Sequence, residues 1–182
     1  MLGVEFSNAA SYTIEHHQHR FAAWAASRAA SFGCHFKVEQ GREILEECGF
    51  AGLAKPEQLP SPDRIDMGHR HWRGKIIEAA NTRGKSFTHG IAAKLINVYL
   101  KSRFVCGGHH SDERVRNLHP PIDRELLATL ARLNVGGYGK RWSEHNWTEL
   151  DSDQYEQLIA FIRDSLKGKP LWMIEEHWKG NQ

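Results

Sequence analysis

The chain is poor in cysteine and has no long apolar run. Its 182 residues include three cysteines, an odd number without a Cys-x-x-Cys spacing, which argues against a disulfide framework and indicates reduced thiols (Cys34, Cys48 and Cys106). No apolar run approaches the roughly 20 residues of a membrane span, and the stretch from Met1 to Thr13 lacks a basic segment followed by an apolar one. We therefore expect a cytoplasmic protein with no membrane partner and no signal peptide.

Internal repeats and low-complexity tracts are missing, and period-2 alternation is scarce, which argues against repeat folds and β-rich folds. Helical periodicity is common instead, and the 40% of hydrophobic residues are enough for a core. We predict an all-α fold that forms a single helical domain over residues 1–182 and acts as a monomer. The proline-rich stretch near 55–63 offers a hinge between two small lobes.

The first predicted helix covers residues 13–32 and stops at Gly33. It has the pattern of an amphipathic helix, with one apolar stripe along its length. The residues that share this stripe are Ile14, Phe21, Ala25, Ala29 and Phe32.

Acidic residues are rare in the middle of the chain. Residues 64–103 contain nine Lys/Arg but only Asp66 and Glu78 as acids, a net charge of +7, whereas the rest of the chain carries −5. A basic segment in an otherwise acidic chain suggests a polyanionic partner such as nucleic acid. The alternative is a solvated basic face without a partner.

A predicted helix at residues 88–105 carries Lys94 in an apolar setting. Four residues recur along it at steps of three and four, so they share one face: Gly90, Lys94, Asn97 and Lys101. Ile91 and Leu95 lie on a neighbouring apolar face. A partly desolvated lysine loses some preference for its charged form and becomes a better nucleophile. The alternative is a lysine whose amine extends to water.

A tight turn precedes this helix, in which Arg83 and Lys85 flank Gly84. Free backbone N–H groups at the start of the following helix can hold a phosphate, and basic residues in the turn add to the attraction. The alternative is an ordinary connection between helices, which often contains glycine.

The stretch "GKSFTHGIAAKLINVYLK…HPPIDRELL" resembles the helix-hairpin-helix DNA glycosylases with AP-lyase activity, and most of all their archaeal 8-oxoguanine DNA glycosylase branch. Lys94-Leu-Ile-Asn97 matches that branch's K-x-x-N helix, and Pro121-Ile-Asp123 matches its P-[IV]-D segment at a helix start. The two motifs occur in the family's order, with 29 residues between the lysine and the aspartate. The resemblance covers roughly residues 84–135, inside a helix-hairpin-helix-like core of about 66–135.

The resemblance implies a bifunctional DNA glycosylase that needs no cofactor and acts on double-stranded DNA with a damaged or modified base. Lys94 would attack C1′ of the sugar and form a Schiff base, and Asp123 would stabilise the sugar cation. The alternative for Asp123 is a plain helix N-cap. The residues predicted to contact DNA are Arg83, Gly84, Lys85, Gly90, Asn97 and Lys101.

Two tryptophans are candidates to stack on an extruded base. Trp172 lies where the resemblance places a late aromatic, and Trp142 lies in a predicted loop, where an indole is free to touch a ligand. Trp147 lies in the same predicted loop.

The twelve histidines give no closed four-ligand pattern, so we predict no metal. Pairs such as His16 and His19, or His109 and His110 near Cys106, leave one alternative open, a metal-dependent nuclease. A second alternative is a non-catalytic DNA-binding module that keeps the hairpin and the basic segment.

Overall fold

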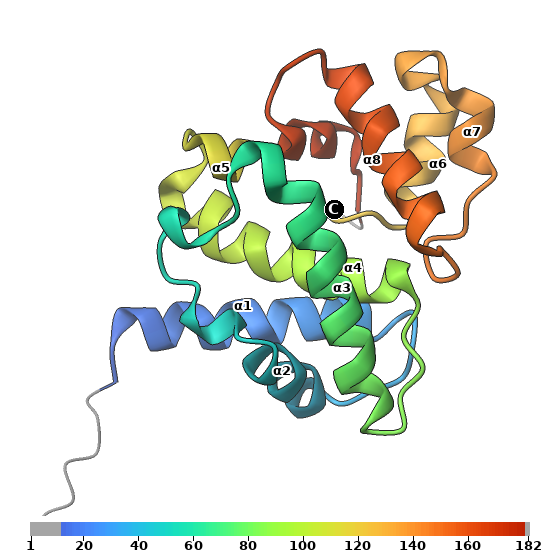
Figure 1. Cartoon of the computed structure of the whole chain (residues 1–182). Helices are drawn as coiled ribbons and strands as arrows, with labels where there is room; N and C mark the ends of the chain where they lie inside the picture. The colour runs from blue at the N-terminus through green and yellow to red at the C-terminus, as the bar shows by residue number, and fades with distance from the viewer. Residues whose placement is uncertain (1–11, 181–182) are drawn as a thin grey trace, which may run out of the picture.

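The structure, a computed structural model, describes residues 12–180 and is built of helices, with no β-strand in that range (Figure 1). This confirms the predicted all-α class. No helix in the described range is long and apolar enough to cross a membrane. Most of the stretch used to judge a signal peptide lies outside the described residues.

Four helices form the N-terminal half of the fold. The central one, α4, packs against α1 on one side and α3 on another, and α2 lies beside α1 (Figure 1). Thr13 caps α1 by accepting a hydrogen bond from the backbone N–H of His16, and Thr88 caps α4 in the same way through Ile91. The bounds of the helices are α1 Ile14–Ala30, α2 Val38–Glu47, α3 Ile65–Asn81 and α4 His89–Leu100.

The apolar stripe predicted on α1 does not face the core. Phe21 and Phe32 on that stripe are 58% and 82% exposed. The buried side of the helix is formed by small residues instead, namely Ala22, Ala23, Ala26, Ser27 and Ala30. Small side chains let α1 and α4 approach closely, so this face was harder to recognise in the sequence than the one with large residues.

The helix that carries Lys94 is buried on nearly all sides. Every residue of α4 from Gly90 to Asn97 is buried, which identifies it as the central helix of the fold. Beyond Leu100 the chain continues as a π-helix, η4 (Lys101–His109), which ends where Gly108 adopts a φ of +93°. The predicted helix over 88–105 therefore exists, but it changes its hydrogen-bonding pattern after Leu100.

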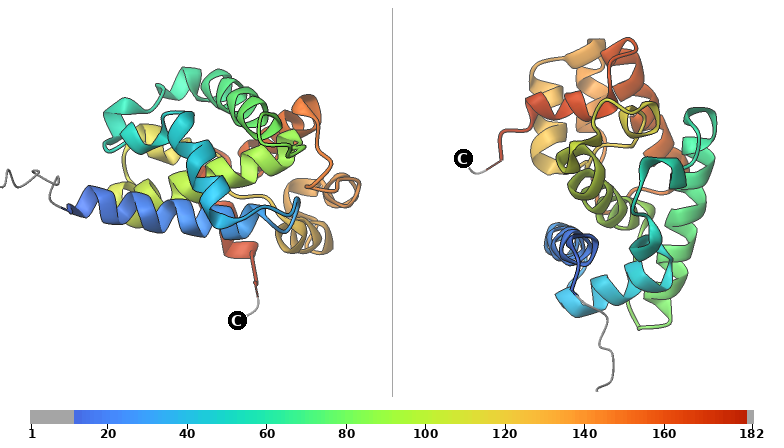
Figure 2. Two further views of the ribbon diagram at one scale, coloured as in Figure 1. Left: turned by 90° about the horizontal axis from the view of Figure 1, so that it is seen from below. Right: turned by 90° about the vertical axis from the view of Figure 1, so that its left-hand side faces the viewer.

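The C-terminal half packs above α1 and against α4, as the right-hand view of Figure 2 shows by looking nearly along α1. The segment predicted as a loop around 135–150 contains a short helix, α7, so the loop prediction was wrong there. The elements are α5 Glu113–Arg116, α6 Arg124–Arg132, η5 Val135–Gly137, α7 Gly139–Ser143, α8 Ser152–Leu166 and η6 Leu171–His177.

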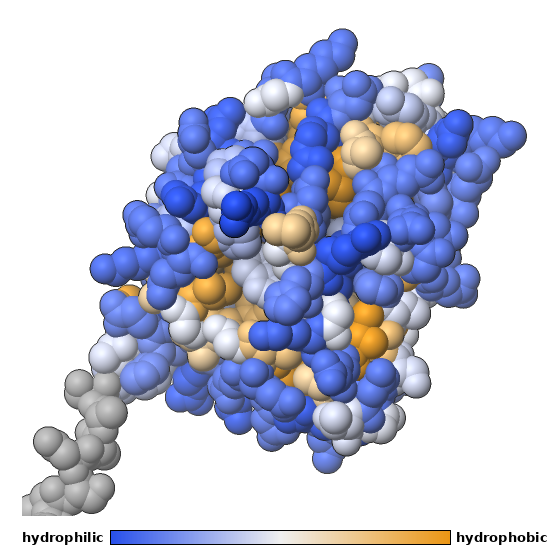
Figure 3. Space-filling model, in the orientation of Figure 1, coloured by the Kyte–Doolittle hydropathy of each residue, from blue (hydrophilic) through white to orange (hydrophobic). Residues whose placement is uncertain are grey.

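One buried apolar cluster includes residues from each of the helices α1 to α8. The proline-rich stretch at 55–63 contains the short 3-10 turns η2 (Pro56–Gln58) and η3 (Pro62–Arg64), and both Pro56 and Leu59 are buried. On the face seen in Figure 3, hydrophilic residues predominate and apolar ones show in patches between them.

Candidate active site

Lys94 is buried and its amine has a specific partner. The residue is only 6% exposed, and its Nζ donates a hydrogen bond to Oδ2 of Asp123 over 2.8 Å. The neighbouring Ala92 and Ala93 are buried in the contact with other helices. The amine therefore does not extend to bulk water, which was the alternative that the sequence left open.

Asp123 serves as a helix cap and as the partner of Lys94 at once. Its Oδ1 accepts a hydrogen bond from the backbone N–H of Leu126 over 2.9 Å, which caps α6. Its Oδ2 accepts from Lys94 and also from the indole N–H of Trp178 over 3.0 Å. The cap fixes one carboxylate oxygen and leaves the other directed at the amine.

Burial and the opposite charge of the partner both shift the pKa values of Lys94 and Asp123. Burial lowers the pKa of Lys94, although the Asp123 carboxylate opposes this shift. Burial alone would raise the pKa of Asp123, but the Lys94 ammonium and the hydrogen bonds from Leu126 and Trp178 outweigh it and hold the pKa below its usual range. The carboxylate therefore stays ionised, and the amine gives up its proton more easily than an exposed lysine.

Both residues line a cavity of about 770 Å³, a size in the range of small-molecule sites. Aromatic rings from three separate parts of the chain form much of its wall. Lys94 Nζ lies 5.8 Å from the centroid of the Trp147 ring, within reach of a cation–π contact. The aromatic residues that line the cavity are Phe21, Phe32, Trp147 and Trp178. The exposed stripe of α1 thus forms one wall of the cavity that holds Lys94.

A second ion pair lines the same cavity. Glu175 of η6 pairs with Lys101, the last residue of the polar line that begins at Gly90, and its side chain is 15% exposed against 35% for Lys101. Burial raises the pKa of Glu175 above its usual range, even though the Lys101 ammonium pulls it down. The cavity therefore contains two carboxylates with opposite pKa shifts.

Asn97 has no free group to offer to DNA. It is 1% exposed, and its amide donates to the carbonyl of Pro120 over 2.9 Å and to the hydroxyl of Tyr155 over 3.0 Å. Its Oδ1 lies 2.7 Å from Nε2 of His69. The predicted direct DNA contact is therefore wrong, and Asn97 instead anchors the segment that leads to Asp123.

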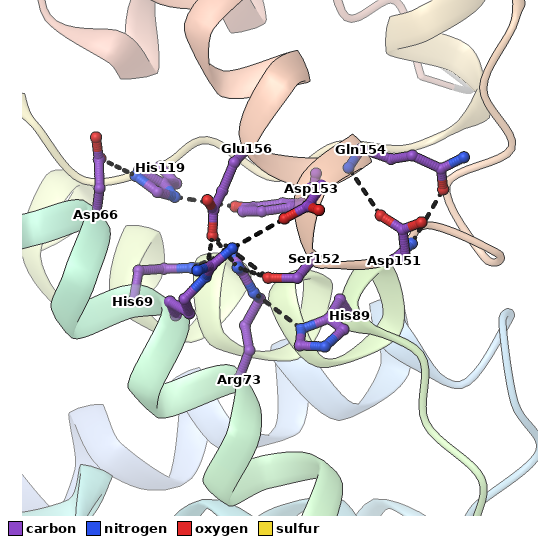
Figure 4. Close-up of polar contacts among 12 residues, drawn as sticks. Asp66, His69, Arg73, His89, His119, Asp151, Ser152, Asp153, Gln154 and Glu156 are labelled. Carbon is purple, nitrogen blue, oxygen red and sulfur yellow. Dashed lines mark hydrogen bonds and ion pairs between the residues drawn. The ribbon is translucent and has the colours of Figure 1, made fainter.

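Asn97 belongs to a buried polar network between α3, α4 and α8. Figure 4 shows the part of this network around His69, Arg73 and His119. Arg73 is fully buried, and its guanidinium donates to Glu156 over 2.8 Å. His119 Nε2 lies 2.9 Å from Asp66, and the His119 ring lies 4.3 Å from that of His69. The network holds His119 and, through Asn97, the carbonyl of Pro120, and so it helps to fix the approach to Asp123.

The basic turn before α4 is engaged with the protein. Arg83 pairs with Glu47 over 2.6 Å, and Lys85 donates to the carbonyl of His35 over 3.0 Å. Gly84 is exposed and has a φ of +67°, a conformation that favours glycine. Arg83 therefore lies over α2 beside a carboxylate, an arrangement that competes with a phosphate.

The start of α4 is covered by the chain around Trp147. Gly90 N–H donates to the carbonyl of Leu150 over 3.3 Å, and the Ile91 N–H goes to the Thr88 cap. A Cβ at Gly90 would lie 1.8 Å from the carbonyl oxygen of Trp147. The prediction of free N–H groups here is wrong for Gly90 and Ile91, and Gly90 serves as a close packing contact rather than a DNA contact.

Neither predicted stacking tryptophan faces Lys94. Trp142 is fully buried in α7, and its indole N–H donates to the carbonyl of Val135 over 3.0 Å, so it has no open ring face. Trp172 is half-buried with its ring edge-on to His110, and it is not among the residues that line the cavity. Trp147 and Trp178 line it instead. The sequence placed Trp147 with Trp142 in a loop where an indole is free to touch a ligand, but it did not single out Trp178.

Among residues 12–180, no three His, Cys, Asp or Glu side chains gather in a way that could hold a metal ion. Comparisons of the chain with protein-family models, with curated proteins and with solved structures found no match.

Proposed function

We propose that the protein is a DNA glycosylase with AP-lyase activity, which excises a damaged or modified base through a Schiff base on Lys94. The observation that carries the proposal is the hydrogen bond between Lys94 and Asp123 inside a cavity walled by aromatic rings. A buried amine beside a carboxylate that stays ionised is the pair of groups that attack on C1′ requires.

The residues divide the chemistry between them. As the glycosidic bond breaks, positive charge develops on the sugar, and the Asp123 carboxylate stabilises it. The base leaves with the electron pair of the glycosidic bond and is protonated from solvent, and Lys94 attacks C1′ as a neutral amine. The C1′–O4′ bond then opens, O4′ takes up the proton that the nitrogen loses, and the resulting Schiff base permits strand cleavage by elimination. The cavity is large enough for an extruded nucleotide, and aromatic faces such as that of Trp147 suit a planar base.

The partner that fits this chemistry is double-stranded DNA. The sequence observation that supports this partner is the net charge of +7 over residues 64–103. Arg73, Lys94 and Arg103 of that segment are buried, so its exposed basic residues would contact the phosphates, and the affinity should then fall with salt. Base extrusion is required because the target atom is inaccessible inside a duplex.

The test is Lys94→Gln, which keeps the length and polarity of the side chain but removes the nucleophile. The purified variant and the wild type are incubated with DNA that carries an abasic site, and borohydride is added to trap a Schiff base. We expect a covalent adduct with the wild type, none with Lys94→Gln, and similar DNA affinity for both. The matched control is Lys75→Gln, which alters an exposed lysine on α3 and should trap normally.

Three outcomes would contradict the proposal. Trapping by Lys94→Gln would show that another amine reacts. DNA binding without any adduct from the wild type would favour the non-catalytic DNA-binding module. Cleavage that stops in the presence of a chelator would favour the metal-dependent nuclease.

A further inference from the structure

We infer that Glu175 is the base that removes the C2′ proton of the Schiff base and so carries out the strand-cleavage step. This inference rests on the proposed function. Glu175 lines the cavity that holds Lys94, and it comes from η6, far from either motif in the sequence.

Glu175 is held beside the continuation of the helix that carries the nucleophile. Its carboxylate pairs with Lys101, which follows Lys94 by two helical turns on the same face, about 10 Å along the helix axis. In a deoxyribose attached to Lys94 through C1′, the C2′ atom is one bond further on, inside the cavity that Glu175 also lines. The charges of Lys94 and Asp123 both influence Glu175, which is consistent with a shared site.

Asp123 is less suited to this role. Its Oδ1 caps α6 through the Leu126 N–H, and its Oδ2 accepts from Lys94 and Trp178. Groups that stabilise the ionised form weaken a carboxylate as a base. Glu175 accepts one side-chain hydrogen bond, from Lys101, and burial makes its proton affinity higher than that of Asp123. The two carboxylates therefore suit different steps.

The step balances as follows. Glu175 takes the proton from C2′, and the electron pair of that C–H bond forms the C1′=C2′ bond while the iminium nitrogen becomes neutral. The nitrogen lone pair then restores the C1′=N bond, the C1′=C2′ pair shifts to C2′=C3′, and the C3′–O bond breaks. The 3′ phosphate leaves with that electron pair. Glu175 holds the proton until it exchanges with solvent.

The experiment separates formation of the Schiff base from its elimination. Wild type, Glu175→Gln and Lys94→Gln are each incubated with a duplex that contains one abasic site. Borohydride trapping measures the Schiff base, and strand cleavage without borohydride measures elimination. We expect Glu175→Gln to trap an adduct in wild-type yield and to cleave the strand about 100-fold more slowly, the effect expected for a lost general base. Glu176→Gln, which removes the neighbouring exposed carboxylate, should match the wild type in both assays.

The results distinguish this inference from the proposed function. Wild-type cleavage by Glu175→Gln overturns the role of Glu175 and leaves Lys94 in place. Loss of trapping in a folded Glu175→Gln also overturns it, because Glu175 would then act before elimination. Failure of the wild type to trap overturns the proposed function, and this inference with it.

A second variant covers the case in which Glu175→Gln does not fold. Glu175→Asp keeps the carboxylate but withdraws it by one methylene. We expect it to cleave more slowly than the wild type and to show a larger isotope effect on a substrate with deuterium at C2′. An unchanged cleavage rate and isotope effect would overturn the inference.

Discussion

Nζ of Lys94 and Oδ2 of Asp123 lie 2.8 Å apart at the wall of the cavity, although 29 residues separate Lys94 from Asp123 in the chain. The contact depends on two local features. α4 presents the Lys94 amine from a buried position, and the cap of α6 holds one oxygen of Asp123 so that the other faces the amine. A structural role as a cap and a catalytic role are therefore compatible in the same aspartate.

The first prediction separates these two roles through Asp123→Asn. Asparagine caps a helix nearly as well as aspartate, but it has no negative charge to stabilise a sugar cation. We expect base excision to slow by about 100-fold or more, measured as single-turnover release of the base, with the helix content unchanged.

The control is Asp151→Asn, which makes the same substitution at the N-cap of α8. It should excise at the wild-type rate. Near-normal excision by Asp123→Asn would show that this aspartate is only a cap, and the proposed mechanism would lose its stabilising charge.

The second prediction concerns the indole N–H that Trp178 donates to Asp123. Trp178→Phe removes this donor, and because Trp178 is 42% exposed the fold should persist. A hydrogen bond to a charged group contributes about 1.5–3 kcal/mol, so we expect excision to slow by about tenfold or more. The pKa of Asp123 should rise, and the acidic limb of the pH–rate profile should move to higher pH. Trp24→Phe, which alters a similarly exposed indole on α1, should change neither the excision rate nor the pH–rate profile.

The all-α class could be predicted from the sequence because helical periodicity is a local pattern, whereas the Lys94–Asp123 pair could be predicted only because its two motifs resemble those of a known family. Helical periodicity, the cap at Asp123 and the spacing of the two motifs are visible in short stretches. Glu175 and Trp178 could not be found in this way, because their positions depend on how η6 packs across the cavity. "LWMIEEHW" holds two tryptophans, and nothing local indicates that Trp178 rather than Trp172 reaches Asp123.

Asn97 and Phe21 are two residues whose burial the sequence pattern predicted wrongly. A polar residue on a polar helix face usually meets water, but Asn97 is buried because three polar groups from elsewhere in the chain satisfy it. A large apolar residue usually marks the core, but Phe21 lines a cavity while alanines make the contact with α4. Tertiary contacts decided both cases, and sequence periodicity contains no information about them.

The third prediction concerns stability at acidic pH. Burial lowers the pKa of His69 and of His119, in His119 against the opposing pull of Asp66. The unfolded chain takes up protons on these histidines below about pH 6.5, whereas the folded protein takes them up only at a lower pH. The free energy of unfolding is therefore not reduced by these histidines above pH 6.5. Below pH 6.5, each histidine lowers the free energy of unfolding by up to about 1.4 kcal/mol per pH unit.

Urea unfolding at a series of pH values from 7.5 to 5 measures this slope. His119→Gln removes one of the two groups and should reduce the slope, whatever it does to stability at neutral pH. His71→Gln, an exposed histidine on α3, should leave the slope unchanged. A wild-type stability that stays constant over this range would mean that the buried histidines do not differ from their unfolded state.

The fourth prediction concerns the contact between Gly90 and Trp147. A Cβ at Gly90 would meet the Trp147 carbonyl oxygen at 1.8 Å, and backbone cannot give way as the end of a side chain can. We expect Gly90→Ala to lower the free energy of unfolding by about 3 kcal/mol or more. Because the Trp147 ring lies beside the Lys94 amine, its displacement should also reduce trapping of the Schiff base.

Gly74→Ala is the matched control, since Gly74 lies inside α3 and a Cβ there meets nothing within 4 Å. Alanine is the better helix former, so this variant should be more stable than the wild type by about 0.5–1 kcal/mol and should trap normally. If the close approach at Gly90 is real, urea unfolding shows a lower free energy of unfolding for Gly90→Ala and a higher one for Gly74→Ala, each relative to the wild type. A Gly90→Ala variant as stable as Gly74→Ala would show that the chain around Trp147 does not cover the start of α4, and the wall that it gives to the Lys94 cavity would be absent.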